Sequence, residues 1–205
     1  MSGPVKRRYD AARRRAAAEV TRERICAAAE ELFLRDGYAR TSIRAVASEA
    51  GVAEATVYLA FLTKAALLDA TILRATRDNE GQPLTAILDA PPPQLLSRLA
   101  SSHAATLQRA ARLIALGESA ILMDATLRPL RERAHAHLRA AYAAIAERLA
   151  DARLLRPNLT PADAADTLYA ICNETTYLRL TREDARTPEQ YATWLTTTLE
   201  ASLLR

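Results

Sequence analysis

The stretch with the clearest chemical character is residues 41–61, TSIRAVASEAGVAEATVYLAF. Its pattern predicts two short helices joined by a tight turn at Gly51, and the second helix carries small and hydroxylated side chains. Hydroxyl donors and the amides of a helix N-terminus suit phosphate, since the amide dipoles point at the anion. Such a helix can lie in the major groove of DNA, as in a helix-turn-helix. The stretch therefore predicts a DNA-binding element.

The elements that position this stretch are predicted to be helical. Glycine is scarce, with 5 in 205 residues, and half of the chain is hydrophobic, while Ala, Leu, Arg and Glu dominate and favour helix. No alternating β-branched run of useful length is present, so we expect no sheet. Residues 1–9 are expected to be flexible. About nine helices are predicted, over residues 10–36, 41–50, 54–60, 64–79, 94–115, 117–124, 126–153, 161–182 and 188–204.

Caps and breakers set these boundaries. Gly37 is expected to end the first long helix as a left-handed cap, and Thr63 to cap the fourth helix. The segment 80–93, EGQPLTAILDAPPP, is the clearest break, because its triple proline cannot lie inside a helix and forms a stiff joint. Thr160-Pro161 and Thr187-Pro188 each combine an N-cap with a proline at the first helical position.

The positive charge is concentrated at the N-terminus. Residues 1–15 carry six Lys or Arg and one Asp, whereas residues 16–64 carry six Lys or Arg and seven Asp or Glu. The whole chain has a formal net charge of +4. The excess therefore belongs to a basic arm that precedes the helix-turn-helix, and not to the helix-turn-helix itself.

Residues 21–68, TRERICAAAEELFLRDGYARTSIRAVASEAGVAEATVYLAFLTKAALL, resemble the N-terminal domain of the TetR family of bacterial transcriptional regulators. The resemblance covers roughly 50 residues without a gap. Beyond it, only helix number and spacing are compatible with the family's variable effector domain. The positions that carry the resemblance are Ala28, Phe33, Gly37, Tyr38, Thr41, Ile43, Ala47, Gly51, Val52, Thr56, Tyr58, Phe61, Lys64 and Leu67.

The resemblance implies an all-α protein with a basic arm over 1–16, a three-helix DNA-binding domain over 17–78, and a C-terminal bundle over 79–205 for dimerisation and effector binding. It also implies a homodimer on a palindromic operator, usually a repressor released by a small molecule. A basic arm with Tyr9-Asp10 is similar to a subgroup of the family with N-terminal extensions.

The predicted DNA contacts combine that resemblance with side-chain chemistry. Thr56, Tyr58 and Lys64 match phosphate-binding positions of the family, and Arg44 matches a position that often reads guanine. Ser42 is a further phosphate donor. Glu54 can accept from a cytosine amino group, and Ala55 can touch a thymine methyl. In the arm, the predicted contacts to the backbone or the minor groove are Arg7, Arg8, Arg13 and Arg14.

The sequence departs from the family after Tyr58. Leu59 and Ala60 replace the usual aromatic, His or Arg residues, and Leu62 replaces a common turn residue. This removes hydrogen-bond donors from the end of the recognition helix. The basic arm is expected to supply the missing attraction for DNA.

The sequence of the C-terminal domain gives less specific indications of function than that of the helix-turn-helix. The last two predicted helices carry apolar stripes (Ala165, Leu168, Cys172 and Tyr191, Leu195, Leu199), and the resemblance implies that these helices pair across a two-fold axis. Polar side chains on otherwise apolar faces are candidates for effector contacts. These candidates are His103, Gln108, Glu118, His137, Tyr142, Asn173, Thr176, Tyr177 and Trp194.

Other classes of function find little support. No catalytic arrangement or Gly-rich phosphate loop is present, so we expect neither an enzyme nor a cofactor. Three histidines and two distant cysteines argue against a metal site. Cys26 and Cys172 are expected to be buried free thiols. Without a signal peptide or a membrane span, a cytoplasmic protein is expected. The alternative left open is a DNA-binding activator or architectural protein whose bundle binds a protein partner.

Overall fold

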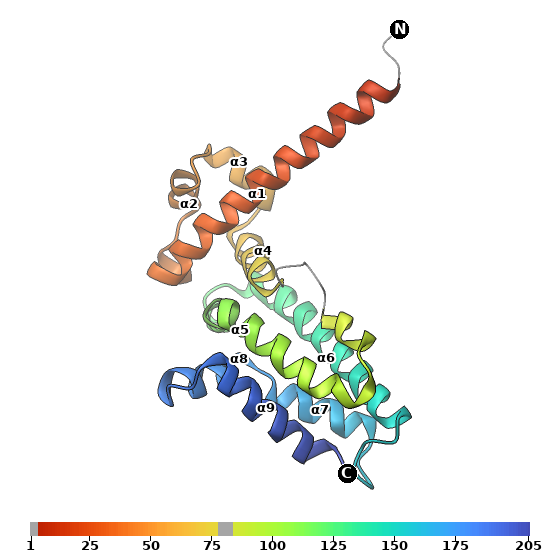
Figure 1. Cartoon of the computed structure of the whole chain (residues 1–205). Helices are drawn as coiled ribbons and strands as arrows, with labels where there is room; N and C mark the ends of the chain where they lie inside the picture. The colour runs from red at the N-terminus through yellow and green to blue at the C-terminus, as the bar shows by residue number, and fades with distance from the viewer. Residues whose placement is uncertain (1–3, 78–83) are drawn as a thin grey trace.

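The computed structural model describes residues 4–77 and 84–205, with side chains from residue 13 and, after the gap, from residue 87. The described part is all-α, as predicted, and holds no strand beyond one isolated bridge between Leu155 and Leu204. Figure 1 shows a small N-terminal head above a larger bundle. The helices are α1 (Pro4–Arg40), α2 (Ile43–Glu49), α3 (Glu54–Phe61), α4 (Lys64–Thr76), α5 (Leu95–Ala120), α6 (Arg128–Asp151), α7 (Pro161–Ile171), α8 (Glu174–Leu178) and α9 (Pro188–Leu203).

Helix α1 begins much earlier than the sequence indicated. The prediction of flexible residues 1–9 is wrong for residues 4–9, because the backbone is helical from Pro4 onward. Its N-terminal half projects beyond the head and away from the bundle (Figure 1). Ala and Arg, which dominate residues 11–18, are strong helix formers and need no tertiary contact to favour this conformation.

Gly37 interrupts α1 but does not end it. Its φ of 81° is positive, as a cap would have, but its ψ of 166° lies outside the left-handed helical region. The chain then makes one more turn, with the Thr41 N–H donating to the Gly37 carbonyl at 3.3 Å. The prediction of a left-handed cap is therefore wrong, although the need for glycine is real, because this region of φ and ψ is essentially restricted to glycine.

The head is built around the buried face of α1. All five predicted stripe positions are at most 7% exposed, which confirms the helical periodicity, and they pack with buried residues of α2, α3 and α4. The α1 stripe is Ile25, Ala28, Ala29, Leu32 and Phe33. Cys26 is also buried, and both cysteines are free, as expected.

The bundle differs from the prediction in how its helices are divided. The predicted helices 94–115 and 117–124 are a single helix, α5, because Gly117 lies inside it. A β-carbon at Gly117 would come 2.8 Å from Cδ1 of Ile72 on α4. Gly117 therefore permits a close approach of two helices instead of marking a break.

The predicted helix 161–182 is divided in the opposite way. It stops at Ile171, and Asn173 caps the short α8, which continues into a π-helical turn over residues 179–183. The number of α-helices in the described residues is thus nine, but they are not the same nine. All three predicted N-caps are confirmed, since Thr63 accepts from the Ala66 N–H and Thr160 and Thr187 each form a capping box.

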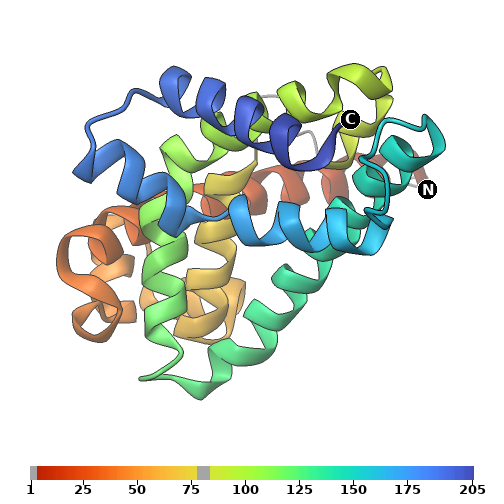
Figure 2. The same ribbon diagram turned by 90° about the horizontal axis from the view of Figure 1, so that it is seen from below.

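Two hydrophobic cores meet along α5. The first contains the head together with the C-terminal half of α5, from Ala110 to Ala120, and the second contains the rest of the bundle. Figure 2 shows the bundle helices α6, α7 and α9 arranged around α5. The predicted domain boundary at 78/79 and the first four residues of the predicted break, 80–83, lie outside the described residues, and the described remainder begins with a 3₁₀ helix over Leu84–Asp89. Pro92–Gln94 form a short 3₁₀ turn that leads directly into α5.

The predicted dimer stripes face the inside of this bundle. Leu168, Cys172, Tyr191, Leu195 and Leu199 are each at most 1% exposed within one chain. Helix α9 packs on α5, and α7 packs on α6. The prediction that these stripes pair with a second chain is therefore wrong, because the periodicity that identified them reports burial within the chain.

No single described helix is both long enough and apolar enough to cross a membrane. Helices α3 and α4 taken together have that length and composition, but the chain bends by 73° between them.

The backbone at Gly37 gives a direct test of the fold. We expect Gly37→Ala to lower the free energy of unfolding by about 1–3 kcal/mol, although no atom lies within 4 Å of the added β-carbon. Gly37→Asn should cost about as much, because Asn tolerates the left-handed helical region but not a ψ near 166°. Urea denaturation measures both, and a near-neutral Gly37→Asn would contradict the observed conformation.

Candidate nucleic-acid interface

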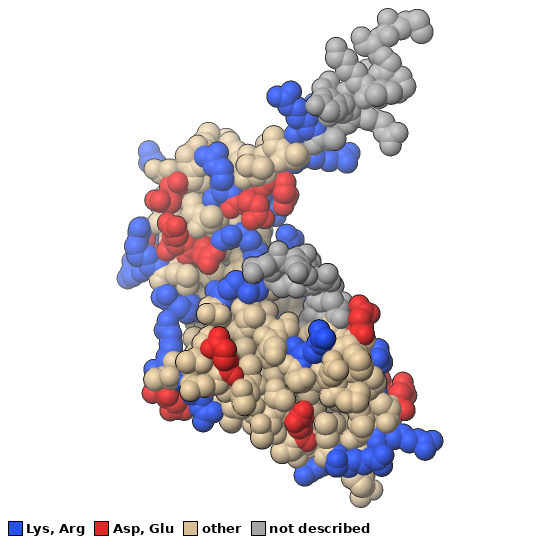
Figure 3. Space-filling view, in the orientation of Figure 1, with Lys and Arg blue, Asp and Glu red and all other residues tan. Residues whose placement is uncertain are grey.

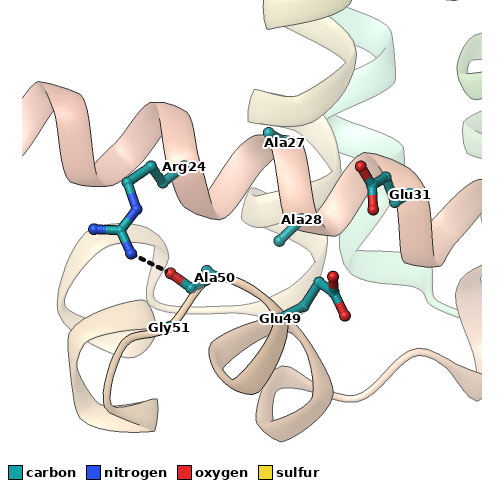
Figure 4. A pocket seen from close by; sticks show the side chains of 7 residues that line it. All are labelled: Arg24, Ala27, Ala28, Glu31, Glu49, Ala50 and Gly51. Atoms are coloured by element: carbon teal, nitrogen blue, oxygen red, sulfur yellow. Dashed lines mark hydrogen bonds between the residues drawn. The ribbon is translucent and has the colours of Figure 1, made fainter.

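Two arginines of α1 hold the helix-turn-helix. Arg24 donates from Nη2 to the carbonyl of Ala50 at the end of α2, at 2.6 Å, as Figure 4 shows. Arg22 donates from Nη1 to the carbonyl of Ala60 near the end of α3, also at 2.6 Å, and its guanidinium lies 4.2 Å from the Phe61 ring centroid. Cations at helix C-termini satisfy terminal carbonyls and oppose the helix dipole. Both short helices are thus fixed to one support.

The turn between α2 and α3 requires glycine for two reasons. Gly51 has a φ of 63°, and a β-carbon there would lie 3.2 Å from Nη2 of Arg24. Around this turn lies an open hollow of about 340 Å³, lined in part by Glu31 and Glu49 (Figure 4). Because two carboxylates share its lining with the single cation Arg24, the hollow does not suit a phosphate.

The predicted contact residues of α2 and α3 lie on the surface. Ser42 caps α2 by accepting from the Ala45 N–H at 3.1 Å, so its hydroxyl hydrogen remains able to donate. Arg44, Glu54 and Ala55 are exposed, and Thr56 is half-buried. The Tyr58 side chain is 46% exposed. The opposite face of α3 supplies Val57 and Phe61 to the core. The recognition helix therefore presents a defined outer face.

Lys64 is only partly available. Its Nζ donates to the Ala39 carbonyl at 3.3 Å and lies 4.3 Å from the Tyr38 ring centroid. Partial burial lowers its pKa, and the nearby Asp124 carboxylate opposes this shift. An ammonium group has three donors, so these contacts orient Lys64 without using all of its hydrogen-bonding capacity.

One carboxylate joins the head to the bundle. Asp124 accepts from the Tyr38 hydroxyl at 2.5 Å through Oδ2, while Oδ1 accepts from the Thr126 N–H at 3.0 Å and caps the 3₁₀ turn (Ala125–Leu127) before α6. The Thr126 and Tyr38 hydrogen bonds lower the pKa of Asp124. Burial, and then this bond, raises the pKa of Tyr38. The base of the head is therefore tied to the corner between α5 and α6.

The described part of the basic arm is helical and not a flexible tail. Arg13, Arg14 and Arg15 are exposed on the projecting half of α1. Arg7 and Arg8 lie in the described helix, but their side chains are outside the described part. Figure 3 shows basic and acidic groups mixed over the visible face of the head, with basic groups on the arm above it. The basic arm and the head of mixed charge, which the sequence distinguished, therefore also occupy different places in the structure.

The comparisons agree with this geometry. Residues 25–71, which span α2, α3 and their support on α1, match the model of the family described as bacterial regulatory proteins, tetR family. The head of the chain therefore carries a TetR-type helix-turn-helix domain, which supports a DNA-binding transcriptional regulator. No curated protein sequence matches the chain.

Solved structures extend the likeness over the whole regulator. NalD, the secondary repressor of the MexAB-OprM multidrug efflux pump in Pseudomonas aeruginosa, is 29% identical, with a TM-score of 0.72 over 93% of this chain and 98% of that chain. The SmeT–triclosan complex is 18% identical (TM-score 0.66, 91% and 92% coverage). A putative regulator from Saccharomonospora viridis in complex with choline is 19% identical (TM-score 0.69, 91% and 99% coverage). The latter two show the fold alone.

Three of the nine predicted effector contacts, His103, Tyr177 and Trp194, belong to one aromatic cluster in the bundle. Tyr191, which was not predicted as a contact, is its centre, with ring centroids 4.9 Å from Tyr177, 5.7 Å from Trp194 and 6.2 Å from His103. Tyr142 borders the cluster and donates to the Cys172 carbonyl at 3.3 Å. The Tyr191 hydroxyl and His103 Nε2 are buried without a hydrogen-bond partner among the described residues. Such groups are uncommon in protein interiors and mark a site of interest.

The other predicted effector contacts do not join this cluster. Glu118 pairs with Arg131 and with His135 Nε2, the latter at 3.2 Å. Gln108 and His137 are exposed. Asn173 caps α8 by accepting from the Thr176 N–H at 2.8 Å. From side-chain type alone, a residue that caps a helix or forms an ion pair could not be distinguished from one that belongs to the aromatic cluster.

Two structural contacts were missed by the sequence analysis. Arg131 is only 6% exposed and lies one helical turn after Leu127 on the buried side of α6, a spacing that could have indicated burial. The Tyr38–Asp124 bond gave no signal, because the residues are 86 positions apart.

The bond between head and bundle predicts a stability effect. We expect Tyr38→Phe to lower the free energy of unfolding at pH 7 by about 1–3 kcal/mol, because it removes a donor from a carboxylate while preserving the ring. Tyr58→Phe is the matched control, since the Tyr58 hydroxyl makes no hydrogen bond to the described residues. Equal stability of the two variants, measured by urea denaturation, would contradict a structural role for the bond.

His103 predicts a pH dependence of stability. Burial lowers its pKa from 6.5 to about 4 in the folded protein, so the unfolded chain takes up the proton first as the pH falls. Between pH 6.5 and 4 the free energy of unfolding should fall, by at most about 3 kcal/mol from this residue; above pH 6.5 the residue contributes no slope. His103→Gln should reduce the decline between pH 7 and 5, whereas His137→Gln, at an exposed position, should not. Identical pH profiles for all three proteins would contradict a buried neutral His103.

Proposed function

We propose that the protein is a ligand-responsive repressor that binds a palindromic operator as a homodimer. The observation that carries the proposal is the outer face of α2 and α3, which is held on α1 by Arg22 and Arg24 and tied to the bundle through Asp124. The similarity to NalD, a repressor, over nearly the full length of both chains supports it. Because the target is chromosomal DNA, we place the protein in the cytoplasm.

The DNA-facing residues divide by chemistry. Ser42, Thr56, Tyr58 and Lys64 are proposed to bind phosphates, which fixes the position of α3 in the groove. Arg44 is proposed to read guanine, Glu54 cytosine and Ala55 a thymine methyl. The cations of α1, from Arg7, Arg8, Arg13 and Arg14, are proposed to follow the DNA backbone.

Two recognition helices must reach successive grooves, so dimerisation is a mechanical requirement of the proposal. Since the predicted apolar stripes of α7 and α9 are buried within one chain, the pairing surface must use the outer faces of the C-terminal helices. A monomer by sedimentation in the presence of its DNA site would contradict the homodimer.

The effector site is proposed at the aromatic cluster around Tyr191. Its unpartnered Tyr191 hydroxyl and His103 Nε2 offer hydrogen bonds next to apolar ring faces, a combination that suits a small organic molecule. SmeT and the S. viridis regulator share the fold, and their structures are complexes with triclosan and choline respectively. A ligand that favours one orientation of the α5–α6 corner would act on the head through the Tyr38–Asp124 bond.

The proposal is tested by selecting binding sites from fragmented genomic DNA with the full chain, followed by mobility shifts on the selected duplexes and on the DNA upstream of the gene. We expect a palindromic site. Thr56→Ala should weaken binding about 10-fold or more, because it removes a hydrogen bond to a charged phosphate. Thr197→Ala, on the exposed side of α9, is the control. Failure to enrich any sequence would contradict the proposal.

Transcription distinguishes a repressor from an activator. A reporter carrying the selected site should be less active when the protein is present and should recover in Thr56→Ala. Higher reporter activity in the presence of the protein would contradict repression and indicate an activator, while leaving the proposed DNA binding unaffected.

The arm makes a separate, quantitative prediction. Changing Arg13, Arg14 and Arg15 to Gln should weaken operator binding and reduce the slope of log affinity against log salt by about 1 for each lost phosphate contact. Changing Arg98, Arg133 and Arg182, which are exposed on the bundle, removes the same charge elsewhere and serves as the control. An unchanged slope in the arm variant would rule out phosphate contacts by these residues.

A further inference from the structure

The outer face of α3 carries an exposed apolar stripe. Leu59 is 86% exposed and Leu62, just beyond the helix, is 78% exposed. Together with the exposed Ala55, they follow a spacing of four and then three residues, which places them on one side of the helix. Large apolar side chains this exposed are few among the described residues, and Leu59 has the most exposed large apolar side chain within any described α-helix.

This stripe does not belong to the core of the head. Val57 and Phe61, on the opposite side of α3, are the residues that pack against α1. Leu59 therefore contributes nothing to the buried face, and its exposure is a property of the surface that meets DNA. On α3 itself, the donors Thr56, one turn before Leu59, and Tyr58, next to it in sequence, accompany this apolar stripe.

We propose that Leu59, with Ala55, recognises thymine methyl groups in the major groove, so that the operator has T·A pairs under the centre of α3. This inference rests on the proposed DNA binding. Thymine is the only standard base with an apolar group on its major-groove edge. Leu59 has no donor or acceptor and can gain only apolar contact. Against a G·C pair it would desolvate polar edges without replacing their hydrogen bonds, which is unfavourable.

Leu59, which replaces the aromatic, His or Arg residue usual in the family, would thus contribute to base recognition. Thr56 and Tyr58 would hold α3 in the groove by binding phosphates, and Leu59 would then distinguish bases by shape and hydration. Specificity would come both from methyl contact at thymine and from the penalty at polar edges.

The test uses the full chain and a site selected from a random duplex library. Each dT of that site is replaced in turn by dU, which removes only the methyl group. For the wild-type protein, at least one substitution per half-site should weaken binding about three- to five-fold, as expected for one buried methyl. In Leu59→Ala, the dT/dU ratio at that position should fall to about 1.

Two further variants separate a specific effect from a general one. Leu122→Ala removes another leucine, which is 90% exposed at the corner after α5, and should keep the wild-type dT/dU ratio. Leu59→Met preserves an apolar side chain and should retain most of the discrimination. It also allows the comparison if Leu59→Ala does not bind.

The outcomes distinguish this inference from the function on which it rests. If no site is enriched from the library, the proposed DNA binding fails. If a site is enriched but no dU substitution affects the wild-type protein, or if Leu59→Ala keeps the full dT/dU ratio, methyl recognition by Leu59 is overturned while DNA binding stands.

Discussion

The structure depends on two hydrogen bonds from α1 to the ends of the recognition motif. Helices of seven and eight residues are too short to be stable alone, and the Arg24–Ala50 and Arg22–Ala60 bonds satisfy carbonyls that both would otherwise leave unpaired. The packing of Val57 and Phe61 and the orientation of the outer face of α3 follow from this attachment. Two of the cations near the helix-turn-helix thus serve folding, which leaves even less positive charge for DNA.

The second dependency runs between head and bundle. The head's core includes the C-terminal half of α5, and Asp124 caps the turn before α6 while accepting from Tyr38. A change in the α5–α6 corner cannot leave the head unaffected, because the same carboxylate takes part in both. The proposed regulation by the bundle would act through two arrangements of this corner with different ligand contacts.

Local features were predictable and long-range ones were not. The α1 stripe and the caps Thr160 and Thr187 follow from neighbours three or four residues away, so periodicity and capping rules found them. Gly117 misled, because glycine marks either a break or a close approach, and only the position of Ile72 decides which. The same periodicity placed apolar stripes on α7 and α9 but could not tell an inner core from a dimer surface. At the interface, side-chain types gave the candidate residues, whereas the partial engagement of Lys64 depends on the fold of Tyr38 beside it.

Because α1 is helical from Pro4, the basic arm differs from a flexible tail in its entropy and in its reach. A flexible tail would lose conformational entropy on meeting DNA and could search a wide volume. A helix has already lost that entropy, and at 1.5 Å per residue the segment before Arg22 reaches roughly 27 Å, or about eight base pairs at 3.4 Å each. In the proposed DNA complex, its cations would therefore stand at set distances from α3 along the DNA backbone. Such an arm would favour duplexes of the right curvature over those that merely carry charge.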